Sequence, residues 1–257
     1  MPMNVIKKSI APGIKVWKGK AAKISYLKQE NLRVPVIFLR SKIQSDKLFL
    51  IASGFHLEET SGPLFLLNPQ TCVSSFTNIL TKMNIVIFPV INQFGLSFKE
   101  TMQDKHLRRN ALGLDYNSAW GFDKEKCQEV RLVEKKLIEL YKEYQLVFVL
   151  SLHEDSTEPG KGYLWMNNIR TNTRKTIQLA LEKKVDKKIL LQMKSTVGLR
   201  RGRIESGFSV VDAKDESFEN FTSEILGIPT LLSEAPFGLD LDRRIAFHRA
   251  ALTSIPF

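Results

Sequence analysis

Residues 48–60 read LFLIASGFHLEET, an apolar run that ends in a short polar segment. The run from Leu48 to Ala52 is short, continuous and apolar, which is typical of a strand buried on both faces of a sheet. The polar segment then brings in His56 and Glu59, with two residues between them. A polar side chain directly after a buried strand leaves the core, so we expect both side chains to face a crevice at the strand's end.

A second apolar run, 146–150, is followed by Ser-Leu-His-Glu-Asp, which contains His153. Two histidines and one carboxylate form a ligand set of catalytic zinc, whose fourth position holds water or substrate. Each of these residues taken singly is also explained by a polar loop, and Glu58 competes with Glu59 as the carboxylate ligand. Two residues between donors let both reach one ion from a bend, so Glu59 is preferred.

Strand patterns and helix patterns alternate along the chain. We expect strands at 34–39, 48–52, 84–90, 146–150 and 228–232, and helices at 63–83 with an interruption at Pro69, 123–144, 172–183, 217–226 and 240–253. This alternation predicts an α/β fold with three layers, α/β/α, around a mostly parallel mixed sheet. We expect a single domain over 1–257, with 1–30 as an N-terminal extension or edge strands. In such sheets the ligand crevice lies beyond the carboxyl ends of the strands.

Composition limits the classes of partner. The formal net charge is +11, but the basic residues are spread along the chain without an aromatic-interleaved RNA motif or a zinc finger. A solvated basic surface is therefore favoured over nucleic-acid binding. No apolar run approaches the roughly 18 residues of a membrane span, so we expect no membrane insertion. Cys72 and Cys127 lack partners at metal-binding spacing, which indicates reduced thiols and a cytoplasmic protein.

Two further segments carry residues that could act beside a metal ion. Glu234 follows the apolar run 228–232, where a partly buried carboxylate can act as a general base. A purely structural carboxylate is the alternative. Arg108 and Arg109 are adjacent, and a guanidinium aimed at a developing oxyanion would stabilise it, although a pair of arginines is more often found at the surface.

The order and flanks of these residues resemble the zinc carboxypeptidase-like metallopeptidases, a superfamily that includes the murein peptide amidases and the aspartoacylase and succinylglutamate desuccinylase group. Five blocks carry the likeness, in family order: GFHLEE at 54–59, FPVINQFG at 88–95, RRNALGLDYN at 108–117, LH at 152–153 and SFENFTSEILGIPTLLSEAP at 217–236. The resemblance implies the fold of that superfamily and one zinc ion bound by His56, Glu59 and His153.

The resemblance also implies roles for the remaining positions. Glu234 would be the general base, Arg108 would polarise the carbonyl with Arg109 as its rival, and Asn117 would contact a substrate carboxylate. At the next position carboxypeptidases carry an arginine that pairs with the substrate's terminal carboxylate, whereas this chain has Ser118. A serine cannot replace that charge-assisted contact.

Two explanations of Ser118 stay open. Either another cation binds the substrate's terminal carboxylate, with Arg200, Arg201 and Arg203 as candidates, or the substrate does not have a free C-terminus. We expect a zinc-dependent hydrolase that cleaves an amide bond in a short peptide, of the metallocarboxypeptidase or cell-wall peptide amidase type, and the basic charge would favour acidic peptides. The alternatives are a deacylase of N-acyl amino acids and, ranked lower, a non-catalytic module that binds an anionic partner.

Overall fold

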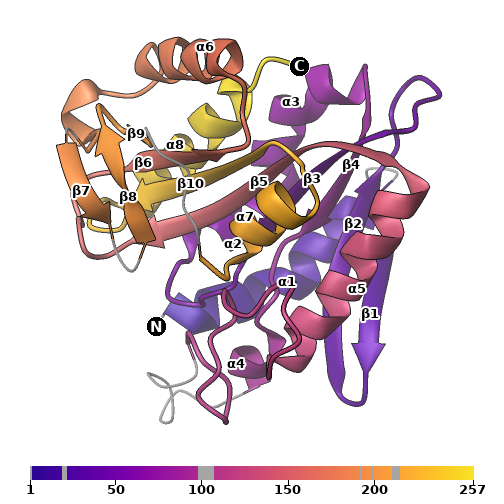
Figure 1. Ribbon diagram of the computed structural model, residues 1–257. Helices are drawn as coiled ribbons and strands as arrows, with labels where there is room; N and C mark the ends of the chain where they lie inside the picture. The colour runs from indigo at the N-terminus through magenta and orange to yellow at the C-terminus, as the bar shows by residue number, and fades with distance from the viewer. Residues whose placement is uncertain (1, 19–21, 98–106, 192, 198–199, 210–214) are drawn as a thin grey trace.

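The computed structural model describes residues 2–18, 22–97, 107–191, 193–197, 200–209 and 215–257 (Figure 1). Its strands are β1 (Lys23–Gln29), β2 (Leu32–Leu39), β3 (Lys47–Ser53), β4 (Asn84–Phe88), β5 (Gln145–Asp155), β6 (Tyr163–Asn167), β7 (Met193–Val197), β8 (Arg200–Glu205), β9 (Phe208–Ser209) and β10 (Thr230–Pro236). Its helices are α1 (Pro2–Lys18), α2 (Ser61–Leu67), α3 (Pro69–Leu80), α4 (Gln93–Ser97), α5 (Gln128–Glu143), α6 (Thr171–Glu182), α7 (Phe218–Asn220) and α8 (Leu241–Ser254), with a 3-10 turn η2 (Lys187–Ile189) and a π-helical turn η3 (Phe221–Ile225).

The described strands form one ten-stranded sheet in the order β1-β2-β4-β3-β5-β10-β6-β9-β8-β7. The four central strands β4, β3, β5 and β10 run parallel, whereas β1, β2, β6, β7 and β8 add antiparallel pairs toward the two edges. The predicted mixed sheet is confirmed, and its parallel part is concentrated at the centre. The carboxyl ends of the parallel strands therefore meet in one place.

Helices cover both faces of this sheet and give the three layers that the sequence predicts (Figure 1). Helices α1, α2, α3, α6 and α8 pack on one face, where Leu150 of β5 and Phe247 of α8 belong to the same buried core. Helix α5, α7 and η3 cover the other face, where Val149 of β5 and Leu137 of α5 belong to a second core. The central strands are thus buried on both faces, which explains their continuous apolar runs.

Side chains alternate between the two faces along β5, and this decides which residues meet. Val149 faces the α5 side and Leu150 the α8 side, so by the same alternation His153 lies on the α5 side and Glu154 on the α8 side. The parallel register pairs His153 with Glu234 of β10. Both side chains therefore belong to the same face of the sheet.

Strands β5 and β10 are longer than their apolar runs predict. β5 continues to Asp155 and β10 to Pro236, so that His153 and Glu234 lie within strands and not after them. The pairing between the two strands persists over this polar part, because ladder hydrogen bonds use main-chain groups whatever the side chain. The prediction that both residues follow a strand was wrong, whereas the prediction that they lie near the same edge is confirmed.

Other helical segments also differ from the prediction. Helix α5 begins at Gln128 and not at 123, because Glu134 holds the preceding loop by accepting from the Gly121 amide and pairing with Lys126. The segment 217–226 splits into α7 and η3. Helix α1 was not predicted. Its Trp17 is buried and donates from Nε1 to the Leu66 carbonyl, which attaches the N-terminal segment to α2.

Both cysteines are buried and free, as predicted: Cys72 lies on α3 and Cys127 caps α5. Burial raises the pKa of each thiol to about 12, so neither is a thiolate at neutral pH. Within the described ranges, no helix combines the length and apolar character needed to cross a membrane.

Gly54 makes the turn that takes the chain from β3 into the His56 loop. Its φ is +67°, and an added Cβ would lie 2.8 Å from the Cα of Val90. The turn is tied to that neighbouring segment, because the Gly54 carbonyl accepts from the Asn92 amide at 2.8 Å. Only glycine combines a positive φ with this close approach of two backbones.

The substitution Gly54→Ala should therefore lower the free energy of unfolding by more than the cost of placing an alanine at a positive φ. Gly227→Ala is the matched control, since Gly227 has φ +69° and no atom within 4 Å of an added Cβ. We expect a loss of about 1–2 kcal/mol for Gly227→Ala and a larger loss for Gly54→Ala, measured by denaturant unfolding. Equal losses would show that the approach to Val90 is not restrictive.

Candidate metal centre and active site

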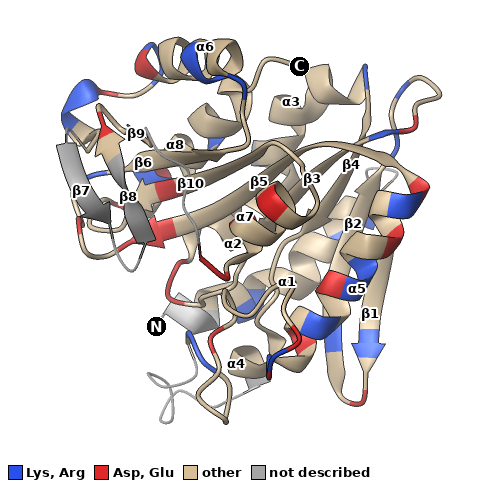
Figure 2. Ribbon diagram, in the orientation of Figure 1, with Lys and Arg blue, Asp and Glu red and all other residues tan. Residues whose placement is uncertain are grey.

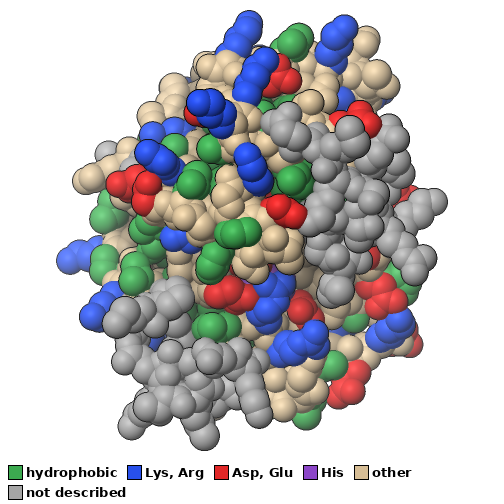
Figure 3. Space-filling model, turned by 90° about the vertical axis from the view of Figure 1, so that its left-hand side faces the viewer, with side chains coloured by type: hydrophobic (Ala, Val, Ile, Leu, Met, Phe, Trp, Pro, Cys, Tyr) green, Lys and Arg blue, Asp and Glu red, His purple; other side chains and the backbone are tan. Residues whose placement is uncertain are grey.

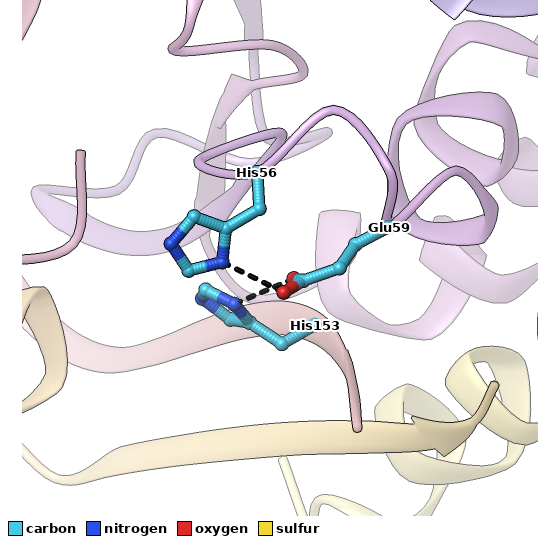
Figure 4. A group of neighbouring side chains, drawn as sticks. All are labelled: His56, Glu59 and His153. Carbon is cyan, nitrogen blue, oxygen red and sulfur yellow. Dashed lines mark hydrogen bonds and ion pairs between the residues drawn. The ribbon is translucent and has the colours of Figure 1, made fainter. Parts of the chain in front are cut away.

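Three buried side chains converge at the carboxyl ends of β3 and β5. His56 and Glu59 come from the loop after β3, and His153 comes from β5 (Figure 4). One ligand atom from each lies within 4.8 Å of the other two. The structure thus brings together the three residues that the sequence selects, and this set can hold a metal ion.

The Glu59 carboxylate is shared between the two imidazoles. Its Oε1 lies 2.7 Å from Nδ1 of His56 and its Oε2 lies 2.8 Å from Nδ1 of His153. Both rings therefore direct the same nitrogen, Nδ1, toward one point. The Phe55 ring stacks on the His153 ring with centroids 4.8 Å apart, which limits how far that imidazole can turn.

The opposite nitrogen of each imidazole faces a second carboxylate. Nε2 of His56 is hydrogen-bonded to Asp115 at 3.0 Å, whereas Nε2 of His153 lies 3.3 Å from Glu219 as an ion pair without hydrogen-bond geometry. A carboxylate that accepts from Nε2–H fixes the tautomer and leaves the Nδ1 lone pair for a metal. The donor set and its supporting carboxylates therefore fit a divalent metal with nitrogen and oxygen ligands.

Asp115 and Glu219 are candidate supporting residues of the site that the sequence did not single out. Asp115 lies two residues before Asn117 in a block already selected by resemblance, so its position offered a signal. Glu219 also lies in a block selected by resemblance, 217–236, but nothing in its local pattern indicates that its buried side chain lies beside His153. Asn117 links the two regions: it donates to Glu219 at 3.2 Å and accepts from the Phe218 amide at 2.9 Å.

The carboxylates around His56 and His153 raise the pKa of both imidazoles. Burial alone would lower the pKa of His56, but the Glu59 charge and the bonds to Asp115 and Glu59 raise it to about 9. For His153, burial again lowers the pKa, whereas Glu59 and Glu219 raise it to about 10. Burial raises the pKa of Glu59, but the two imidazolium charges outweigh that effect and bring it well below its usual range.

The two adjacent arginines differ in what they touch. Arg108 places Nη1 2.7 Å from Glu58 and 3.3 Å from Glu59, with its side chain half exposed. Arg109 donates to the Gly113 carbonyl at 2.7 Å. Both line the cavity described next, but Arg108 contacts a candidate metal ligand and is the better placed of the two. Glu58 pairs with Arg108, and this contact favours Glu59 as the ligand.

A cavity of about 670 Å³ opens over the three ligands. Its lining includes Arg108, Asn117, Ser118, Tyr163 and Glu234. Glu234 is half-buried and lies beside His153 in the strand register. The Ser118 hydroxyl donates to the Asp115 carbonyl at 3.0 Å, so this position offers no positive charge to a substrate.

Acidic side chains are more numerous than basic ones in the described lining of the cavity. Besides the ligand Glu59 and its neighbour Asp115, the lining contains the side chains of Asp155, Asp215, Glu216 and Glu234 against two arginines. Lys and Arg lie elsewhere, for example along α5 and α6 (Figure 2), and one face shows them interspersed with acidic and hydrophobic side chains (Figure 3). The side chains of Arg200, Arg201 and Arg203 lie outside the described residues. The described lining gives no support to the expected preference for acidic peptides.

Comparison with known proteins supports the fold. No family model matches the sequence, and no curated protein is similar to it. Among solved structures, a presumed metallopeptidase from Shewanella amazonensis SB2B has a TM-score of 0.75 at 19% identity, covering 96% of this chain and 90% of that chain. Metallo-carboxypeptidases from Burkholderia cenocepacia and Pseudomonas aeruginosa have TM-scores of 0.67 and 0.65, both at 16% identity, over 95% of this chain and 67% and 66% of theirs. The chain therefore has the zinc carboxypeptidase-like fold that its sequence predicts.

If Asp115 and Glu219 orient the ligand imidazoles, Asp115→Asn and Glu219→Gln should each weaken zinc binding. We expect an increase of about 10–100-fold in the zinc dissociation constant, as for other outer partners of metal-bound histidines, measured by competition with a chromogenic chelator. Glu216→Gln is the control, because it removes a carboxylate of the same cavity that pairs with Lys124. Unchanged affinity in both variants would refute the orienting role.

Zinc binding should release protons at neutral pH. The pKa values of about 9 for His56 and about 10 for His153 mean that both imidazoles of the metal-free protein are protonated at pH 7. A metal binds the deprotonated form, so binding should release about two protons at pH 7 and affinity should rise with pH. The protonated pair stabilises the metal-free fold fully below pH 6.5, and this contribution is lost as the pH rises through 9 to 10. Calorimetry in buffers of different ionisation enthalpy counts the protons, and a value near zero would contradict the raised pKa values.

Proposed function

We propose that this protein is a zinc-dependent hydrolase that cleaves an amide bond in a short peptide. One observation carries the proposal: Glu234 lies beside His153 in the strand register, in the cavity that also contains His56, Glu59 and Arg108. A general base, a set of metal ligands and a guanidinium are thereby available to one bound substrate. The cavity volume of about 670 Å³ falls in the range of small-molecule and peptide sites.

Each residue has a separate task in the proposed reaction. Zinc, when bound by His56, Glu59 and His153, would polarise the substrate carbonyl and make water more acidic. The Glu234 carboxylate takes a proton from the attacking water and delivers it to the leaving nitrogen, which is general base and then general acid catalysis. The Arg108 guanidinium stabilises the negative charge that develops on the carbonyl oxygen.

The substrate's terminal group is the part of the proposal that Ser118 constrains. A hydroxyl already bonded to the Asp115 carbonyl cannot form an ion pair with a carboxylate. A peptide amidase or a peptidase that accepts a blocked or extended C-terminus is therefore favoured over a simple carboxypeptidase. The deacylase alternative uses the same metal and base, and a panel of N-acyl amino acids against short L- and D-peptides, with free and amidated ends, separates the two.

A non-catalytic role is the weaker alternative. An anion-binding module needs positive charge at its site, whereas the described lining of this cavity is richer in carboxylates. It also has no use for two imidazoles that share the Glu59 carboxylate and whose Nε2 atoms face the further carboxylates Asp115 and Glu219. The cytoplasmic location expected from the free cysteines stays a prediction.

The substitution Glu234→Gln tests the mechanism directly. We expect kcat to fall by about 10²–10⁴-fold while bound zinc stays at the parental level, because Gln cannot accept the proton and Glu234 is not one of the three ligands. Glu216→Gln is the matched control for losing one charge from the cavity and should keep its activity. A Glu234→Gln variant with full activity would exclude the proposed base.

A further inference from the structure

A buried polar network lies on the α8 side of the sheet, behind the metal ligands. Helix α8 contributes His248, which is fully buried, and Arg244, whose side chain is 15% exposed. His248 contacts Ser233 of β10 and Ser61 of α2, each at 3.0 Å. Arg244 pairs with Glu154 of β5, whose side chain is fully buried.

Ser61 joins the two halves of this network. Its amide and its hydroxyl both donate to Oε1 of Glu154, each at 2.6 Å. The hydroxyl oxygen also lies 3.0 Å from Nε2 of His248. Since a serine has only one hydroxyl proton and Glu154 receives it, Nε2 of His248 must be the donor in the second contact.

The single hydroxyl proton of Ser61 determines the direction of every hydrogen bond that His248 makes in the network. Burial lowers the pKa of His248 to about 3, and the nearby His153 charge adds to that shift, so the imidazole is neutral and carries one proton. With that proton on Nε2, Nδ1 accepts from the Ser233 hydroxyl. The bonds therefore run from Ser233 to His248, to Ser61 and then to Glu154, which also accepts from Arg244.

The members of the network are sequence neighbours of the residues in the proposed active site. Ser61 is two residues after Glu59, Glu154 directly follows His153, and Ser233 directly precedes Glu234. His153 and Glu234 face the other side of the sheet, where Glu59 contacts His153, so the network joins the same segments on the opposite face, through Ser61, Glu154 and α8. The network thus ties together the backbones that carry two metal ligands and the proposed base.

We propose that His248 is a positioning residue, which holds the Glu59 loop, the His153 strand end and the Glu234 strand in register through Ser61, Glu154 and Ser233. This inference rests on the proposed function, because it assigns His248 a role in the proposed active site. Its test, however, measures metal binding and not hydrolysis. A ring that only fills space would contribute to stability without affecting how the ligands meet. A ring that transmits position must make both hydrogen bonds.

The test compares three variants of α8. His248→Phe keeps an aromatic ring of similar shape but removes both hydrogen bonds, and His248→Gln restores one donor and one acceptor. Ser254→Ala is the control, since it removes a buried hydroxyl of the same helix that donates to the Ala250 carbonyl and lies apart from the network. Zinc affinity is measured by chelator competition, and the thermal unfolding of each metal-free variant is measured alongside.

We expect His248→Phe to weaken zinc binding by about tenfold, at the lower end of the range for outer partners, and His248→Gln to recover most of that loss. Ser254→Ala should lower the unfolding temperature while its zinc affinity stays at the parental level, because among the described residues its hydroxyl bonds only within α8 and to Lys184. His248→Phe with parental zinc affinity, or with a loss no greater than that of Ser254→Ala, overturns the inference.

A measurement on the unmodified protein covers the case in which His248→Phe does not fold. Nitrogen-15 correlation spectra should show His248 as the Nε2–H tautomer, and finding the proton on Nδ1 overturns the inference.

Failure of the proposed function gives a different experimental result from failure of the positioning role. A parent protein that binds no zinc, or binds zinc and hydrolyses neither peptides nor acyl amino acids, refutes that function, whereas an insensitive His248→Phe in a zinc-binding parent refutes only the positioning role.

Discussion

The Glu59 carboxylate, which contacts both ligand imidazoles, is the interaction on which the site depends. A carboxylate buried between two rings is stable only if both rings are held at the correct angle and charge. Three contacts meet this need: Asp115 is hydrogen-bonded to Nε2 of His56, the Glu219 charge lies 3.3 Å from Nε2 of His153, and Phe55 limits the tilt of His153. The same contacts that keep Glu59 charged also direct both Nδ1 atoms to one point, so the electrostatics of the metal-free site and its capacity for metal have a common cause.

The sequence predicts the parts of this arrangement that lie next to strong apolar runs. His56 and His153 adjoin the apolar runs of buried central strands. A short run of β-branched and aromatic residues strongly favours a buried strand over other structures. Asp115 lies in a turn and Glu219 in a short irregular helix, where local pattern carries no information on long-range partners. The N-terminal α1 and the small strands β6 to β9 were missed for a related reason, since their stability comes from packing against the rest of the chain.

Charge is the property that the sequence describes least well. A net charge of +11 describes the molecule as a whole, and long-range attraction falls off within about 10 Å at ordinary salt. A substrate inside the cavity instead interacts with the side chains around it, and among those described the carboxylates predominate. The overall charge therefore governs solubility and encounter, whereas preference within the site depends on a few local groups.

The alternation of side chains along β5 and β10 has a consequence for how the chain folds. A slip of β5 by one residue against β3 and β10 would turn the His153 side chain toward the α8 core and the Glu154 side chain toward the α5 side, so that metal ligands and network would fail together. Only the correct register presents three ligands to one ion, and a ligand that binds only the native state adds to its stability by mass action. Metal binding would therefore shift the population toward molecules in which the sheet has paired in the correct register, because only those molecules can bind the ion.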